Sequence, residues 1–427
     1  MKPSLNLPAF PRMMPVRQNF PAPAAVDVRA ILRAELPVLA PRLKAGARIA
    51  VGVGSRGISN LQPIVATVVE FLKAAGAKPF VVPAMGSHGG ATPQGQIELL
   101  AEYGISEAAL GIPLEAAMEA RVIGTTPDQV EVFFSEAAWA ADGVIVINRV
   151  KPHTDFRSDV IGSGLLKMLV IGLGKRLGAA NYHIASSRFG YEHVLRTAAR
   201  VTLQAAPILA GVAIVENQYH DTARVTVVAA PDLERREAEL YREAQSLMPR
   251  LPFDDIDLLI VDQLGKNISG AGMDPNVIGR SLHGYSALLG ERTTRPVVRR
   301  IFVRDLTPES HGNAVGIGLA DFTSTRLVRQ IDHQVTYLNA LTALSLQSAK
   351  IPVHFETDRE SIGRALDSLA LKDTRRASVV RIRNTLSLEK VEIAEALTEQ
   401  LPQHPVLQPS GPLREMAFEA TDDLAAL

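Results

Sequence analysis

Short aliphatic runs alternate with segments of helical periodicity along the first part of the chain. Short apolar runs bounded by turn residues predict buried strands, and apolar residues spaced three or four apart predict amphipathic helices. The expected strands are 48–53, 79–84, 130–134, 143–148, 208–216 and 224–229. The expected helices are 61–75, 94–103 and 233–246. This alternation predicts a mostly parallel sheet covered by helices.

The pattern changes near Leu251, where Pro252 and an acidic cluster precede a new strand at 258–261. Further strands are expected at 297–303 and 379–383, with helices at 334–349 and from Leu388 onward. We therefore predict an α/β protein of two domains, each a mostly parallel sheet with helices on both faces, with the active site in the cleft between them. The expected ranges are 1–252 for a Rossmann-like, cofactor-binding domain, 253–400 for a C-terminal α/β domain, and 401–427 for a tail that packs back on the N-terminal domain.

Composition narrows the possible functions. The chain has 427 residues, with 45 Lys and Arg against 45 Asp and Glu, so it lacks the basic excess of a general nucleic-acid binder. It has no cysteine, which excludes disulfides, zinc ribbons, iron–sulfur clusters and a thiol nucleophile. Prolines interrupt the first 25 residues, which read as an extended arm, and no apolar run reaches the roughly 18 residues of a membrane span. We expect a cytoplasmic protein that does not bind membranes.

A glycine-rich loop, Gly52-Val53-Gly54-Ser55-Arg56-Gly57, follows the first buried strand and precedes a helix. That is the context of a dinucleotide fingerprint. The fingerprint also requires a carboxylate at the end of the second strand, and none is present there. Arg56 inside the loop favours an anionic ligand. An NAD site, a phosphate or carboxylate loop and a plain tight turn remain alternatives at this point.

Two histidines follow predicted strands, at the edge where open α/β sheets bind ligands. His88 lies in Gly86-Ser87-His88-Gly89-Gly90, where glycines allow a ligand to approach the backbone. His153 follows Pro152, whose fixed φ stiffens the loop. Each histidine could instead be an exposed or structural loop residue. The remaining histidines, apart from His183, are expected to be structural or exposed.

Lys167 lies in an almost wholly aliphatic segment that begins Ser163-Gly164-Leu165-Leu166. A buried ammonium without a partner is costly, so such a lysine is paired, reaches solvent along its stem or is used chemically. His183 follows 16 residues later, and glycines at 172, 174 and 178 should break any helix between the two. The chain could then fold back and bring Lys167 and His183 together.

Taken in order, these segments resemble the nickel-dependent lactate racemase family. The matching features are the Arg loop, the glycine-framed His loop, the Pro-His loop, Ser-Gly-x-x-Lys, and a histidine 16 residues after that lysine. The resemblance implies a nickel-pincer nucleotide, the pyridinium-3,5-bisthiocarboxylic acid mononucleotide of nickel, covalently tethered to Lys167. It implies His183 as the nickel ligand, Ser163 and Gly164 beside the cofactor, and His88 with His153 as the acid/base pair. Arg56 would bind the substrate carboxylate or steer its hydroxyl.

The implied reaction is racemisation or epimerisation of a 2-hydroxy acid by hydride transfer to the cofactor, an isomerase activity. Two histidines suit it, because each enantiomer presents its hydroxyl on a different side of a planar keto acid. Val53 stands where the family usually has Asp, and the stretch between His153 and Lys167 is longer, so a larger hydroxy acid such as a sugar acid is as plausible as lactate.

In the second domain Lys266 is the first choice for a substrate-facing cation and Arg280 the second. The expected partners are the hydroxy acid and, transiently, the enzymes that make the cofactor. Alternatives are an NAD-linked oxidoreductase using the glycine-rich loop, a non-catalytic small-anion-binding protein, and a histidine-ligated zinc hydrolase.

Overall fold

The computed structural model describes residues 6–54, 57–154, 156–282 and 295–427. The chain divides into Ala22–Met248, called here the central unit, and Met1–Pro21 with Pro249–Leu427, called the terminal unit. The division after Met248 lies near the boundary expected after residue 252. The N-terminal arm, however, belongs to the terminal unit rather than to the domain expected for it. The cause is strand pairing: β1 (Met13–Gln18) pairs antiparallel with β14 (Ser387–Ala394).

The central unit is built on a five-stranded sheet of order β3-β2-β6-β7-β8. Its strands are β2 (Arg48–Val53), β3 (Lys78–Pro83), β6 (Gly143–Arg149), β7 (Ile208–Glu216) and β8 (Thr222–Ala229). Only β8 is antiparallel to its neighbour. The mostly parallel sheet predicted from the aliphatic runs is therefore confirmed.

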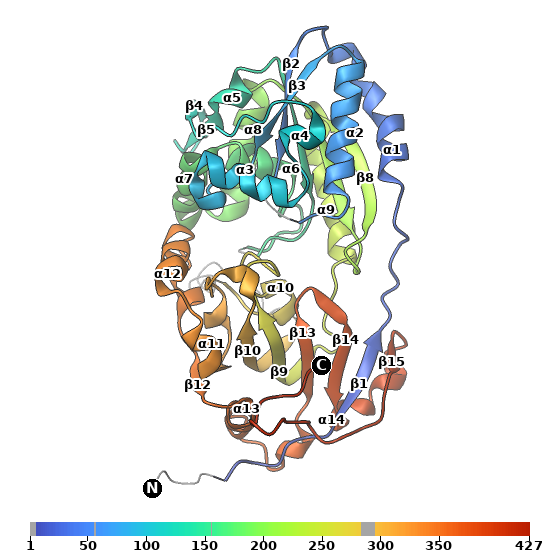
Figure 1. Cartoon of the computed structure of the whole chain (residues 1–427), viewed down its shortest axis with the longest axis vertical. Coiled ribbons are helices and arrows are strands. Elements are labelled where there is room, and N and C mark those ends of the chain that lie inside the picture. The colour runs from blue at the N-terminus through green and yellow to red at the C-terminus, as the bar shows by residue number, and fades with distance from the viewer. Residues whose placement is uncertain (1–5, 55–56, 155, 283–294) are drawn as a thin grey trace. The chain divides into compact units, whose positions relative to one another are not determined.

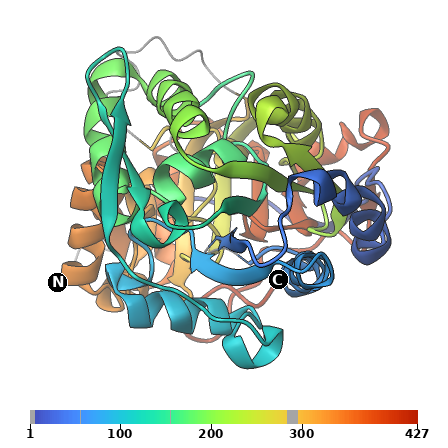
Figure 2. The same ribbon diagram turned by 90° about the horizontal axis from the view of Figure 1, so that it is seen from above.

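Both faces of this sheet are covered, because successive residues of a strand point to opposite faces. Ala50 and Val144 belong to a core beneath α7 (Lys175–Phe189), α8 (Tyr191–Ala205) and α9 (Leu233–Ser246). Ile49 and Ile145 belong to the opposite core, beneath α1 (Val28–Glu35) and α2 (Leu61–Ala74). The blue helices α1 and α2 and the green helices α7 and α8 lie on different sides of the sheet (Figures 1 and 2).

Shorter elements complete the central unit. They are α3 (Pro93–Glu102), α4 (Glu107–Leu110), α5 (Glu136–Trp139) and the antiparallel pair β4 (Ala120–Thr125) and β5 (Glu131–Ser135). The strand expected at 130–134 is thus real, but it forms a separate two-stranded sheet with β4. This pair packs against α7 and α8. The sequence could not reveal this, because an apolar run predicts a buried strand and does not specify its partner.

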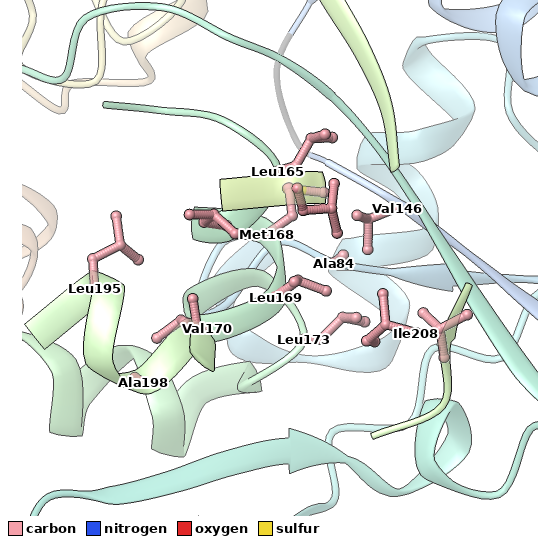
Figure 3. Packing of buried hydrophobic residues seen from close by; sticks show 14 of the residues in the cluster. Ala84, Val146, Leu165, Met168, Leu169, Val170, Leu173, Leu195, Ala198 and Ile208 are labelled. Atoms are coloured by element: carbon pink, nitrogen blue, oxygen red, sulfur yellow. The ribbon is translucent and has the colours of Figure 1, made fainter. Parts of the chain in front are cut away.

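The aliphatic segment after β6 is helical and buried. It consists of α6 (Leu165–Lys167) followed by a π-helical turn, Met168–Gly172. Figure 3 shows side chains of this segment, including Leu165, Leu169 and Leu173, packed among other core residues. The predicted break before α7 occurs at Leu173 and Gly174, and Lys175, which begins α7, has a positive φ of 56°. Gly178 does not break the helix and lies inside α7.

The terminal unit contains an eight-stranded sheet of order β12-β11-β10-β9-β13-β14-β1-β15. The first five strands in this order are parallel and the last three pair antiparallel. Its other elements are β9 (Asp255–Leu264), α10 (Pro275–Ile278), β10 (Val297–Leu306), β11 (Phe322–Ser324), α11 (Thr325–Arg329), α12 (His333–Thr342), β12 (Val353–Phe355), α13 (Asp358–Asp367), β13 (Val379–Asn384), α14 (Glu395–Thr398) and β15 (Leu407–Pro409).

Three predictions for the second half need correction. The segment from Leu388, expected as a helix, belongs to strand β14, which pairs with β1 on one side and β13 on the other. The helix expected over 334–349 ends at Thr342, before a short 3-10 turn. The tail 401–427 packs within the terminal unit rather than on the N-terminal domain, because β15 pairs with β1. Arg381 also donates to the Ala425 carbonyl at 2.7 Å. In the described residues, no helix has the length and apolar character needed to cross a bilayer.

Candidate functional site

The order of strands in the central sheet reverses between β2 and β6. From β2 the chain crosses to β3 on one side, and later to β6 on the other. In open α/β sheets this topological switch point, at the carboxyl ends of the strands, is where ligands bind. The loops that leave the sheet there follow Val53 and Arg149. They are the two loops in which the sequence placed Arg56 and His153.

The segment carrying Lys167 lies directly on this switch point. Asn148, near the end of β6, donates from Nδ2 to the Gly164 carbonyl at 2.9 Å. Lys151 and Ser163 exchange two backbone hydrogen bonds of 2.8 Å. A Cβ on Gly54, at the end of β2, would come within 3.3 Å of Met168 Cε, so the glycine permits this close approach. The backbone around Lys167 is therefore held against both strands.

Lys167 is half-buried, whereas Leu165, Leu166 and Met168 around it are buried. Its Nζ donates to Ser163 Oγ at 3.2 Å. The sequence correctly marked this lysine as a cation within an apolar segment. The structure adds that Ser163, four residues earlier, lies next to the amine.

His153 is buried, with 5% of its surface exposed, so it is not an exposed turn residue. Its ring stacks on Phe156, with centroids 4.7 Å apart and an interplanar angle of 23°. Phe156 in turn stacks on Tyr191 at the start of α8, at 5.7 Å. Phe156 thus connects the His153 imidazole to Tyr191.

His183, on α7, contacts Tyr191, the ring farther from His153. Its ring lies edge-on to Tyr191, with centroids 6.4 Å apart and an angle of 74°. The rings of His153, Phe156, Tyr191 and His183 therefore form one continuous row, called here the aromatic row. Sequence reasoning missed Phe156 and Tyr191. A signal was present, because aromatic residues make up only 5% of the chain and Phe156 stands three positions after His153.

His88 is exposed, in a loop whose glycines Gly86, Gly89 and Gly90 all have positive φ. Gln96, from α3, donates from Nε2 to the carbonyls of Gly86 at 3.1 Å and His88 at 3.2 Å. The Gly86 amide donates to the Gly172 carbonyl at 3.1 Å. The loop thus contacts the end of the π-helical turn that follows Lys167. The glycines around His88 allow the backbone to make these contacts.

Lys175 was not predicted as part of the site, and it is completely buried. Its Nζ donates to the Pro83 carbonyl, at the end of β3, at 2.8 Å. Burial lowers the pKa of this amine to about 8. Lys175 links the start of α7 to the strand end that leads into the His88 loop.

The remaining predicted residues fall outside the described part of the central unit. Arg56 falls outside the described residues. Lys266 and Arg280 belong to the terminal unit. Lys266 Nζ donates to the Gly270 carbonyl at 2.5 Å and to Asn339 Oδ1 at 2.8 Å. Arg280 forms an ion pair with Asp321 at 2.7 Å. Both cations therefore have partners within their own unit.

The dinucleotide reading of the glycine-rich loop fits the geometry poorly. In that fingerprint the third glycine permits close packing of helix and strand. Here a Cβ on Gly57 would meet its nearest neighbour, Tyr103, at 3.8 Å, which is ordinary contact. Helix α2 begins only at Leu61. Within the described part of the chain, no group of three or more His, Cys, Asp or Glu side chains is placed to hold a metal ion.

Comparisons with known proteins bear on this arrangement. The model of a family described as a domain of unknown function, DUF362, matches residues 54–270. The fold is similar to that of the lactate racemase apoprotein from Thermoanaerobacterium thermosaccharolyticum, with a TM-score of 0.51 and 14% identity over 88% of this chain and 99% of that one. A glycotransferase of kitacinnamycin gives a TM-score of 0.17 at 10% identity, over 78% of this chain and 97% of that one, too low to support an argument. No curated protein matches the chain significantly in sequence.

Proposed function

The chain belongs to the DUF362 family, and within that family we propose that it is a racemase or epimerase of a 2-hydroxy acid. Its fold is distantly lactate racemase-like. At this identity the likeness concerns the fold alone, so the activity must be argued from the residues at the switch point.

The proposed cofactor is a nickel-pincer nucleotide joined covalently to Lys167, with His183 as the protein ligand of nickel. The residues fit such a group: Lys167 is half-buried and its amine lies beside Ser163, at the point where α/β sheets bind nucleotides. His183 and His153 both adjoin the aromatic row. When bound, this cofactor would supply a hydride acceptor, which no protein side chain provides.

The chain's own residues would handle the proton and the carboxylate. His153 and His88 would take the proton from the substrate hydroxyl and return it, a task for a group that titrates near neutral pH. The stacked ring of Phe156 holds the His153 imidazole in one plane. Arg56 is the proposed partner of the substrate carboxylate.

The single observation that carries the proposal is the aromatic row. It connects His153, expected as an acid/base residue, with His183, expected as a metal ligand, although the two are 30 positions apart in sequence. Lys167 lies between them in sequence, on the segment bonded to β6. A set of unrelated structural histidines would not be expected to share one row of rings.

The proposal is tested by expressing the chain together with the enzymes that make the cofactor. We expect an intact-mass increase that maps to Lys167, with bound nickel, in the wild type. Lys167→Ala should abolish both, whereas His183→Ala should keep the added mass and lose most of the nickel. An unmodified Lys167 without nickel in the wild type would refute the cofactor assignment.

The reaction is tested with a panel of 2-hydroxy acids carrying deuterium at the C2 carbon. Inversion with the label retained supports hydride transfer, because the hydrogen then returns from an acceptor that does not exchange with water. Inversion with loss of the label would indicate proton abstraction instead. Binding without inversion across the panel would favour the anion-binding alternative, and saturable NADH binding would favour the oxidoreductase.

A further inference from the structure

A carboxyl group lies buried beneath the segment that carries Lys167. Glu237 is on α9, on the same face as Leu233, Leu240 and Tyr241, and only 1% of its surface is exposed. A helix normally places a glutamate on its solvent face, because burying a charge without a charged partner is costly. None of the ion pairs identified among the described residues involves Glu237.

The contacts of Glu237 all converge on one short stretch of backbone. Its Oε2 accepts a hydrogen bond from the Leu166 amide at 2.8 Å. A Cβ on Gly164 would come within 2.2 Å of Oε1 and 2.5 Å of Cδ, so the carboxyl group lies flat against that glycine. Oε1 has no hydrogen-bond partner in the described part of the chain. The environment therefore raises the pKa of Glu237 to about 7, with burial as the main cause and the amides of Leu166 and Leu165 opposing it.

A helix cap does not account for this arrangement. A serine, threonine or aspartate before Leu165 could accept the same amide at little cost. Instead the chain has Gly164 there and brings a carboxyl group from α9, 71 positions away from Leu166. The desolvation of that group costs more than one capping hydrogen bond returns. The burial of Glu237 is therefore better explained by its effect on Lys167, the residue that follows Leu166.

We propose that Glu237 is a positioning residue for Lys167, holding the first turn of α6 through the Leu166 amide so that the lysine amine stays beside Ser163. Asn148 holds the same turn at a second point, through the Gly164 carbonyl. Together these two contacts anchor the backbone at Gly164 and Leu166, directly before Lys167. The importance of this anchoring rests on the proposed function, in which Lys167 carries the cofactor.

The test measures the reactivity of Lys167 in the full chain without cofactor. Trace labelling with acetic anhydride, followed by peptide mass spectrometry, gives the labelling rate of Lys167 relative to exposed Lys78. In Glu237→Leu the Leu166 amide loses its acceptor, so the relative rate at Lys167 should rise by about fivefold, the net effect of losing one typical hydrogen bond. Glu237→Gln keeps an acceptor oxygen and should stay within about twofold of the wild type. Glu239→Gln, a half-exposed position on the same helix, should leave the rate unchanged.

A purely structural role would lower the unfolding temperature without changing the relative labelling of Lys167 in the folded protein, and that result would overturn the proposal. If Glu237→Leu does not fold, hydrogen exchange in the wild type decides instead. We expect a strongly protected Leu166 amide that remains protected in Glu237→Gln; exchange at the rate of an unstructured peptide would refute the role. Neither readout uses the cofactor, so a wild type that gains no mass at Lys167 would count against the proposed function alone.

Discussion

The imidazole of His153 lies 4.7 Å from the ring of Phe156 and almost parallel to it. His153 follows the end of β6, at the sheet's switch point, and Phe156 belongs to the same loop. The ring of Phe156 also contacts Tyr191, which begins α8. The core of the central unit thereby holds a loop residue, as the proton-transfer role proposed for His153 requires.

Phe156→Leu tests whether the stacked ring matters for activity. Leucine keeps an apolar side chain of similar size, so the loss of stability should be about 1 kcal/mol. Activity on the best hydroxy acid should fall by about tenfold or more, because the His153 ring is free to tilt. Phe189→Leu, at a partly buried position packed against the same core, is the matched control. Equal activities in the two variants would show that the stacking is incidental.

Gly164→Ala should destabilise the central unit. The new Cβ would come within 2.2 Å of Glu237 Oε1, and both the glycine and the carboxyl group are buried. Overpacking of this kind costs about 1–3 kcal/mol. Gly57→Ala is the control, because its Cβ would have no neighbour nearer than 3.8 Å. Fluorescence of Trp139, the one tryptophan of the chain, reports urea unfolding of the central unit.

Glu237 should make the stability of the central unit depend on pH. Its pKa is raised from 4.5 to about 7 in the folded protein. Between these values the folded chain holds a proton that the unfolded chain has lost, so stability falls as pH rises through this window. The full effect is about 3 kcal/mol. Glu237→Gln should remove that slope and Glu239→Gln should keep it, both followed by Trp139 fluorescence between pH 5 and 7.5. If stability falls with pH as steeply in Glu237→Gln as in the wild type, another group is responsible for the pH dependence.

The lowered pKa of Lys175 predicts that stability depends on pH in the opposite direction at higher pH. Burial lowers the pKa of its amine from 10.5 to about 8. Between these values the unfolded chain holds a proton that the folded chain has lost, so stability rises with pH in this window. Lys175→Met should abolish the rise, which is about 3 kcal/mol in full, and methionine should fill the site without a charge. Exposed Lys78→Met is the control, and urea midpoints at pH 7, 8, 9 and 10 are the measurement.

Local sequence was sufficient for much of the fold. Strand β2, strand β7 and helix α9 begin and end at the predicted residues, because period, flanking turns and burial all agree there. Strand β14 was predicted as a helix, and β5 was assigned to the main sheet. In both cases the partner strand, β1 or β4, decides the structure. Pairing with a distant segment leaves no mark on local periodicity.

The candidate site divides in the same way. The sequence by itself determined that Lys167 stands alone in an apolar segment and that His88 and His153 follow strands, because these are relations between neighbouring residues. Only the tertiary structure decided that Phe156 and Tyr191 join His153 to His183, and that Glu237 lies beneath Leu166. Those contacts join residues up to 71 positions apart, and they exist only once the helices have packed on the sheet. The sequence therefore indicated the candidate reactive groups, and long-range packing determined which residues surround them.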